Sequence, residues 1–147
     1  MLSVVKSYGL NGIHGYIIKC EVDITSGLPG YDIVGLVGTS MKESKERVKS
    51  AIKNSALKYP IVKVTVNLAP ADTKKEGSCF DLPIAVGIIT TYLSDNSNKK
   101  KTPFAPKLSL SETAIIGELS LSGEVRKVKG VLPIAIKLRE MGIKNFL

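Results

Sequence analysis

The alternation of apolar and polar residues predicts four strands in the first half of the chain. Residues 14–25 alternate most regularly and place one row of side chains on a shared face of a half-buried strand. Residues 2–8, 31–36 and 62–68 predict the other three strands. We expect the first three strands to pair antiparallel in chain order, because this is the simplest arrangement of successive strands. The shared face of 14–25 consists of Tyr16, Ile18, Cys20, Val22 and Ile24.

The helical spacing of apolar residues predicts three helices, at residues 40–56, 82–93 and 130–141. In the first helix, Ser40 and Glu43 have the spacing of a capping box, and Thr39 is a competing cap. The second helix is expected to be capped near Asp81.

The last third of the chain predicts a hairpin and the beginning of one more strand. The hairpin covers residues 114–128 and turns at Ser122 and Gly123. A further strand starts at residue 143. Before the hairpin, residues 94–107 are polar and rich in lysine and contain two prolines, which predicts a flexible surface loop.

The composition is that of an ordinary globular protein, with 44% hydrophobic residues. At this length we expect residues 1–147 to form a single domain. No apolar run reaches the ~20 residues that cross a membrane, and the N-terminus lacks the features of a signal peptide. Two cysteines, Cys20 and Cys79, do not form a disulfide framework, so we expect a reduced, cytoplasmic protein.

The formal net charge of +8 favours an acidic partner such as nucleic acid. Part of the excess lies at residues 99–101, which we expect to be solvated within their loop. Four lysines share one face of the first predicted helix, and two more lie in the loop after the fourth strand. They are candidate partner contacts, and a merely solvated lysine-rich face is the alternative. The six residues are Lys42, Lys45, Lys49, Lys53, Lys74 and Lys75.

The loop between the fourth strand and the second helix carries the most suggestive chemistry. Cys79 lies at the predicted N-terminus of a helix, where the helix dipole lowers the pKa of a thiol. A cysteine nucleophile also needs a base. His14 is far away in the sequence, and Lys74 and Lys75 are expected to be solvated and protonated. A small, half-buried structural thiol is therefore the alternative interpretation.

Phosphate and metal chemistry find weaker support. Residues 75–79 lack the spacing of a phosphate-binding loop, and the glycines of 35–38 fit a turn better than an anion site. Asp72, Glu76 and Asp81 have no recognisable ligand spacing. We expect them to be a turn residue, a solvated charge and a helix cap, so we predict no cofactor or metal in this chain.

Several motifs in a fixed order resemble those of one family. They include Val66-Asn-Leu-Ala-Pro-Ala-Asp72, Phe80-Asp-Leu-Pro-Ile-Ala85 and Gly117-Glu-Leu-Ser-Leu-Ser-Gly-Glu-Val-Arg126. Shorter ones are Gly27-Leu-Pro-Gly30, Ile33-Val-Gly-Leu36, Lys75-Glu-Gly77 and Gly130-Val-Leu-Pro133, together with the helix from Lys42 to Asn54. The chain resembles the N-terminal domain of the magnesium-chelatase-like AAA+ proteins of the YifB/ComM type. The resemblance covers nearly all of the chain outside 94–107.

The resemblance implies an α+β fold, a two-layer α/β sandwich like domain 2 of ribosomal protein S5, with a mixed sheet and helices on one face. It also implies an AAA+ module downstream that binds ATP and Mg and assembles as a hexamer. ComM-type members process DNA as branch-migration helicases during natural transformation. This chain is then expected to be a non-catalytic domain that engages DNA or supports ring assembly.

The same fold occurs in Lon-type proteases, which use a serine and a lysine. The resemblance places Cys79 at the serine position and Leu132 at the lysine position, and a leucine side chain cannot accept a proton. Lys129 lies before the third helix, so its reach is in question. A protease-like hydrolase that uses Cys79 and a purely structural docking module are the two alternatives to the non-catalytic domain.

Overall fold

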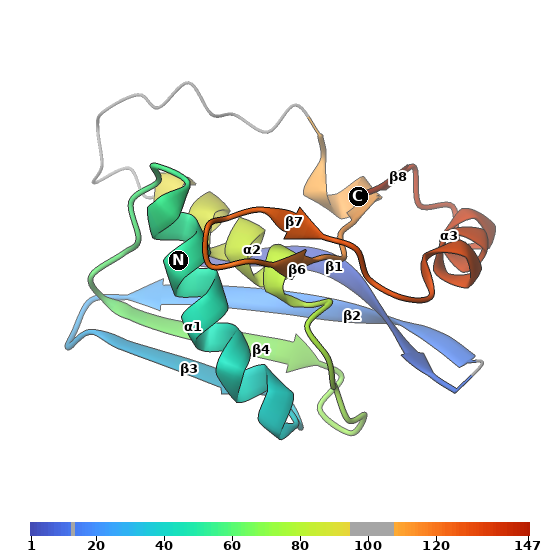
Figure 1. Cartoon of the computed structure of the whole chain (residues 1–147), viewed down its shortest axis with the longest axis horizontal. Helices are drawn as coiled ribbons and strands as arrows, with labels where there is room; N and C mark the ends of the chain where they lie inside the picture. Colours follow the sequence, from blue (N-terminus) through green and yellow to red (C-terminus); the bar gives the residue numbers. More distant parts are fainter. Residues whose placement is uncertain (13, 95–107) are drawn as a thin grey trace.

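The computed structural model describes residues 1–12, 14–94 and 108–147. Figure 1 shows the helices and strands in the order in which the chain forms them. The strands are β1 (Leu2–Asn11), β2 (His14–Thr25), β3 (Gly30–Val34), β4 (Lys63–Ala69), β5 (Thr113–Ala114), β6 (Glu118–Leu119), β7 (Val125–Arg126) and β8 (Asn145–Phe146). The helices are α1 (Thr39–Asn54), α2 (Asp81–Ser94) and α3 (Val131–Glu140), with a short 3-10 turn η1 (Leu110–Glu112).

Six strands form one mixed sheet in the order β3-β4-β2-β1-β5-β8, and β6 and β7 form a separate hairpin. Helices α1 and α2 pack together on one face of the sheet (Figure 1). The predicted α+β fold, a two-layer sandwich with a mixed sheet, is confirmed. Within the described ranges, no helix combines the length and the apolar character needed to cross a membrane.

The predicted antiparallel pairing is confirmed for β1 and β2 but is wrong for β2 and β3. Strand β4 lies between β2 and β3, and β3 pairs with β4 in parallel. The reason is α1, which connects β3 to β4: a crossover through a helix returns the chain in the same direction and so permits parallel pairing. This arrangement brings the loop after β3 next to the loop after β4.

The predicted apolar faces of the strands are confirmed. On β2, the side chains of Ile18, Cys20 and Val22 are fully buried, and β4 contributes a matching buried row between its polar positions. Burying one such aliphatic side chain stabilises a fold by about 1.5–3 kcal/mol. The row on β4 consists of Val64, Val66 and Leu68.

Helix α3 lies outside the layer formed by α1 and α2. Its buried residues Ile134 and Leu138 pack with Tyr8, Ala114 and Ile116 in a second apolar cluster. The intervening Ile115 belongs to the main core. Because neighbouring residues of an extended chain point to opposite sides, α3 covers the opposite side of this end of the sheet. The expectation that the helices lie on one face therefore holds for α1 and α2 but not for α3. Figure 1 shows α3 beyond the end of the sheet where β1 and β2 meet.

The predicted capping box of the first helix is wrong. Helix α1 begins at Thr39, and its N-cap is Gly38, which makes no side-chain capping bond. The Ser40 hydroxyl instead accepts a hydrogen bond from the backbone N–H of Gly77, at 3.1 Å. Ser40 therefore helps to attach the loop after β4 to α1.

The predicted hairpin is confirmed only in its second half. Glu118 and Leu119 pair with Arg126 and Val125 across a turn that includes Gly123, whereas Ala114 joins the main sheet as part of β5. The predicted loop at 94–107 lies outside the described residues except for Ser94, which is the last residue of α2.

Candidate functional site

The loop after β4 is fastened to the loop between β3 and α1. The Lys75 N–H donates to the Leu36 carbonyl, and the Gly38 N–H donates to the Lys75 carbonyl. Gly35 has a positive φ of 105°, and a side chain there would overlap the Leu68 carbonyl. Glycine is thus required for the two loops to meet.

Lys75 is buried, contrary to the prediction that it is solvated and available to a partner. Its side chain is fully buried, and its ammonium group donates to the carbonyls of Gly35 and Pro70. Burial lowers the pKa of Lys75, and the nearby Asp72 carboxylate opposes this shift. The buried side chain therefore holds the two loops together. The prediction that Lys75 contacts a partner is wrong, and Lys75 is a structural residue.

Asp81 is the centre of a buried polar cluster rather than a simple helix cap. Its carboxylate is fully buried and accepts hydrogen bonds from the Ser44 hydroxyl at 2.5 Å and the Arg47 guanidinium at 2.6 Å. The Leu119 N–H also donates to it, at 3.3 Å. The Asp81 carboxylate thus joins α1, α2 and the β6–β7 hairpin. The prediction that Asp81 only caps a helix is therefore wrong.

Cys79 lies in the turn two residues before Asp81, the first residue of α2, and is half-buried. Burial raises the pKa of its thiol to about 11, although a backbone hydrogen bond opposes the shift. The loss of solvation outweighs this hydrogen bond, so the lowered pKa expected from the sequence is not found. The thiol is therefore protonated at neutral pH and is a poor nucleophile.

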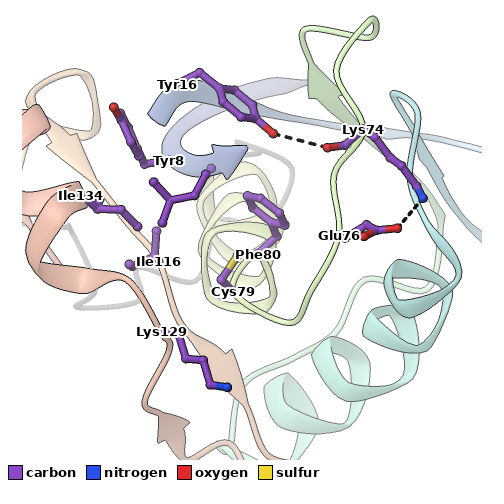
Figure 2. Close-up of a pocket in the computed structure, with 11 residues that line it drawn as sticks. Tyr8, Tyr16, Lys74, Glu76, Cys79, Phe80, Ile116, Lys129 and Ile134 are labelled. Atoms are coloured by element: carbon purple, nitrogen blue, oxygen red, sulfur yellow. Dashed lines mark hydrogen bonds and ion pairs between the residues drawn. The ribbon is translucent and has the colours of Figure 1, made fainter. Parts of the chain in front are cut away.

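A cavity of about 330 Å³ lies beside Cys79. Figure 2 shows it between the end of β1, the start of β2, the loop before α2 and the segment before α3. Its lining residues are Tyr8, Gly9, Leu10, Tyr16, Lys74, Glu76, Cys79, Phe80, Ile116, Lys129 and Ile134.

The residues considered as bases for Cys79 do not all lie at the cavity. Lys129 does line the cavity with Cys79, so its reach is greater than its place before α3 indicated. In Figure 2 its side chain points away from the Cys79 sulfur. His14 and Leu132 are exposed and do not line the cavity, and Leu132 is 72% exposed on α3. The structure brings a thiol and an amine together without arranging them as an activated pair.

Alkylation of Cys79 by iodoacetamide is expected to be slow at neutral pH and to accelerate about tenfold per pH unit up to about pH 11, because only the thiolate reacts. Mass spectrometry of the modified peptide measures the rate. In a Cys79→Ser variant the folded chain should show almost no labelling, because Cys20 is fully buried. A rate for Cys79 that levels off below pH 9 would contradict the raised pKa.

Three of the predicted partner lysines form an exposed stripe on α1. Lys42, Lys49 and Lys53 are exposed, and no ion pair involves them within the described part of the chain. Lys45 is less exposed, and its ammonium lies over the Tyr31 ring, 5.3 Å from the centroid. We call Lys42, Lys49 and Lys53 the α1 lysine stripe.

The acidic residues of the loop do not converge. Glu76 forms an ion pair with Lys74 at 2.5 Å, Asp72 accepts a bond from the neighbouring Thr73 hydroxyl, and Asp81 is buried with Arg47. Among the residues that the structure describes, no group of three or more His, Cys, Asp or Glu side chains is placed to hold a metal ion.

Sequence reasoning missed the cavity because its walls come from separate segments. Tyr16 was assigned only to a strand face, yet its hydroxyl donates to the Lys74 carbonyl at 3.3 Å and positions the cavity rim. The hydrogen bond from Ser78 to Glu118 was also missed, although it holds the β6–β7 hairpin against the loop before α2. Both contacts join residues 40 or more positions apart, so no local spacing indicated them.

Comparison with known proteins gives a consistent set of similarities. The family model described as Subunit ChlI of Mg-chelatase matches residues 20–147. The chain is 41% identical over 143 residues to YifB of Escherichia coli strain K12, and 40% identical over 132 residues to competence protein ComM of Haemophilus influenzae. These alignments cover 97% and 90% of this chain, but only 26% and 24% of the relatives. The chain thus spans about a quarter of their length.

A weaker similarity extends to a protease. The chain is 25% identical over 173 residues to the Lon protease of Helicobacter pylori, and the alignment covers 99% of this chain and 19% of the protease. This agrees with the resemblance to Lon-type proteases seen in the sequence.

Proposed function

Because the chain belongs to the family of the Mg-chelatase subunit ChlI, we propose that it is the non-catalytic N-terminal domain of a Mg-chelatase-like AAA+ ATPase and that it holds DNA for that ATPase. The ATPase module, with its ATP and Mg, lies in a separate part of the protein, and six copies assemble into a ring. The name of one relative, competence protein ComM, supports a role in DNA processing and natural transformation.

The observation that carries the DNA role is the α1 lysine stripe. Helix α1 has five basic and two acidic residues, and the stripe extends from Lys42 to Lys53, about 16 Å along a helix that rises 1.5 Å per residue. The face of the sheet opposite α1 and α2 has mixed charges, with Lys63 beside Asp32 and Asn67 bonded to Glu21. Phosphates are attracted by an excess of positive charge, so α1 is the better DNA surface.

The buried environment of Cys79 supports the non-catalytic part of the proposal. The hydrolase alternative needs a thiolate and a base in contact, whereas burial keeps the thiol protonated and Lys129 points away (Figure 2). Incubation of this chain with unfolded casein tests the alternative. Cleavage that disappears in Cys79→Ala would establish a protease, and intact casein would exclude one for this chain.

Reversing the stripe is expected to abolish most of the DNA affinity. In a Lys42→Glu, Lys49→Glu, Lys53→Glu variant, binding to a fluorescein-labelled 20-base-pair duplex should weaken about tenfold or more at 50 mM salt, because three phosphate contacts become repulsive. Fluorescence anisotropy measures the dissociation constant.

The matched control reverses the same number of exposed lysines elsewhere. Lys19 and Lys63 lie on the face of the sheet opposite α1 and α2, and Lys137 lies on α3. Replacing these three with glutamate changes the net charge equally and should weaken binding much less. Equal losses in the two variants would indicate that DNA responds only to total charge. Absence of binding by the unmodified chain would leave ring assembly as the role of the domain.

A further inference from the structure

We propose that the cavity beside Cys79 binds an extended segment of another polypeptide, with one aliphatic or aromatic side chain inside the cavity and a neighbouring carboxylate on Lys129. This inference goes beyond the DNA role and uses a different surface. It requires recognition of the segment and no bond cleavage.

The size and lining of the cavity suit a single apolar side chain. Its volume of about 330 Å³ falls at the lower end of the range for ligand pockets. Phe80 and Ile116 are buried at its base, and Ile134 of α3 and Leu10 of β1 line it as well. Figure 2 shows Phe80 and Ile116 facing the same space as the Cys79 side chain. An aliphatic or aromatic group placed there exchanges water for apolar contacts.

The edge of β1 next to the cavity can hold the backbone of an extended segment. The Lys6 carbonyl accepts a hydrogen bond from Ile115, so the backbone groups of Lys6 face β5. Alternate residues present their backbone groups to the same edge, so those of Leu10 face that side too. Strand β5 pairs with β1 only at Lys6, and no backbone hydrogen bond joins Leu10 to another described residue on that side. Leu10 is 38% exposed, although its side chain packs close to Gly130. An extended segment can add to a strand edge of this kind through backbone hydrogen bonds.

The charges at the rim specify an acidic neighbour in the bound segment. Lys74 is already paired with Glu76 at 2.5 Å. Lys129 is exposed, and among the described residues no carboxylate lies within ion-pairing distance of its ammonium. An acidic side chain next to the inserted apolar residue supplies the missing partner. A basic segment gains no such pair, because Glu76, the only carboxylate among the lining residues, is already paired with Lys74.

The test uses the acetylated and amidated peptide Ser-Thr-Phe-Asp-Thr-Ser and the ¹⁵N-labelled chain. Chemical shifts at Leu10, Cys79 and Lys129 are expected to change in a saturable manner as the peptide is added. Replacing the phenylalanine of the peptide with serine should remove the effect. Replacing the aspartate with lysine should weaken binding about tenfold, because Lys129 then faces a like charge.

Two variants of the protein separate the cavity from general charge. Lys129→Glu should weaken binding of the Phe-Asp peptide, and Lys127→Glu, an equal change at an exposed residue outside the cavity, should not. Cys79→Leu, which fills the cavity, should also weaken binding. The proposal is overturned if the phenylalanine and serine peptides bind alike, or if Lys127→Glu matches Lys129→Glu. It is also overturned if duplex DNA, and not the peptide, shifts the cavity signals. The DNA role tested at α1 stands or fails separately.

Discussion

An Asp81→Ala variant is expected to lose about 3–5 kcal/mol of unfolding free energy, as do other proteins in which one partner of a buried ion pair is removed. The carboxylate is fully buried and bonded to the Arg47 guanidinium and the Ser44 hydroxyl. Its removal leaves Arg47, which is only 22% exposed, without its closest counter-charge. It also leaves the Leu119 N–H without its acceptor. The loss is severe, because the total unfolding free energy of a typical domain is only about 5–15 kcal/mol.

Urea unfolding followed by circular dichroism measures this loss. Asp81→Asn keeps a hydrogen-bond acceptor of similar shape but no charge, and it should fall between the original chain and the alanine variant. Asp32→Ala removes an exposed carboxylate that lies 3.9 Å from Lys63, and it should change stability by less than about 0.5 kcal/mol. An Asp81→Ala variant as stable as Asp32→Ala would show that Asp81 does not hold α1, α2 and the hairpin together.

A Gly35→Ala variant is expected to lose about 2–5 kcal/mol, from a left-handed backbone and from overlap with another strand. Gly35 has a φ of 105°, and an added Cβ would overlap the Leu68 carbonyl on β4. The Gly35 carbonyl also accepts a hydrogen bond from the buried Lys75 ammonium at 2.8 Å. Relief of the overlap would thus disturb the attachment between the two loops.

Gly77 provides a matched control for the backbone contribution. Its φ is 94°, close to that of Gly35, but an added Cβ would meet nothing within 4 Å. Gly77→Ala should therefore cost only about 1–2 kcal/mol. For a chain of this length, 1 kcal/mol shifts the midpoint of thermal unfolding by about 2–4 °C, so calorimetry separates the two variants. Equal losses would show that the contact with Leu68 is unimportant.

The parts of the fold that were predicted correctly depend on local periodicity. The buried row on β2 was evident because Ile18, Cys20 and Val22 alternate with charged residues. The strand order was missed because local patterns do not report which strands pair. The parallel pairing of β3 with β4 follows from the crossover through α1, and the sequence did predict a helix between these two strands.

The site was less predictable, because its chemistry depends on burial. Lys75 and Lys74 are adjacent in the sequence, yet one is fully buried and the other is exposed and paired with Glu76. Asp81 had the position of a helix cap, but its carboxylate bonds with side chains of α1. The position of Leu132 at the place of the protease lysine stays a prediction from the family resemblance. The half-burial of Cys79 agrees with the structural thiol that the sequence offered as the alternative to a nucleophile, and this burial raises the pKa of the thiol.

The dependence of DNA affinity on salt concentration tests the DNA-holding role of the domain most directly. If the α1 lysine stripe neutralises three phosphates, log K should fall with log salt with a slope of about −3, and the slope should approach zero in the variant with glutamate at Lys42, Lys49 and Lys53. Between 50 and 200 mM salt, a slope of about −3 changes K by about tenfold to hundredfold. Anisotropy titrations over this range therefore distinguish the two proteins. No binding at 50 mM salt, or the same slope in both proteins, would contradict the proposed role.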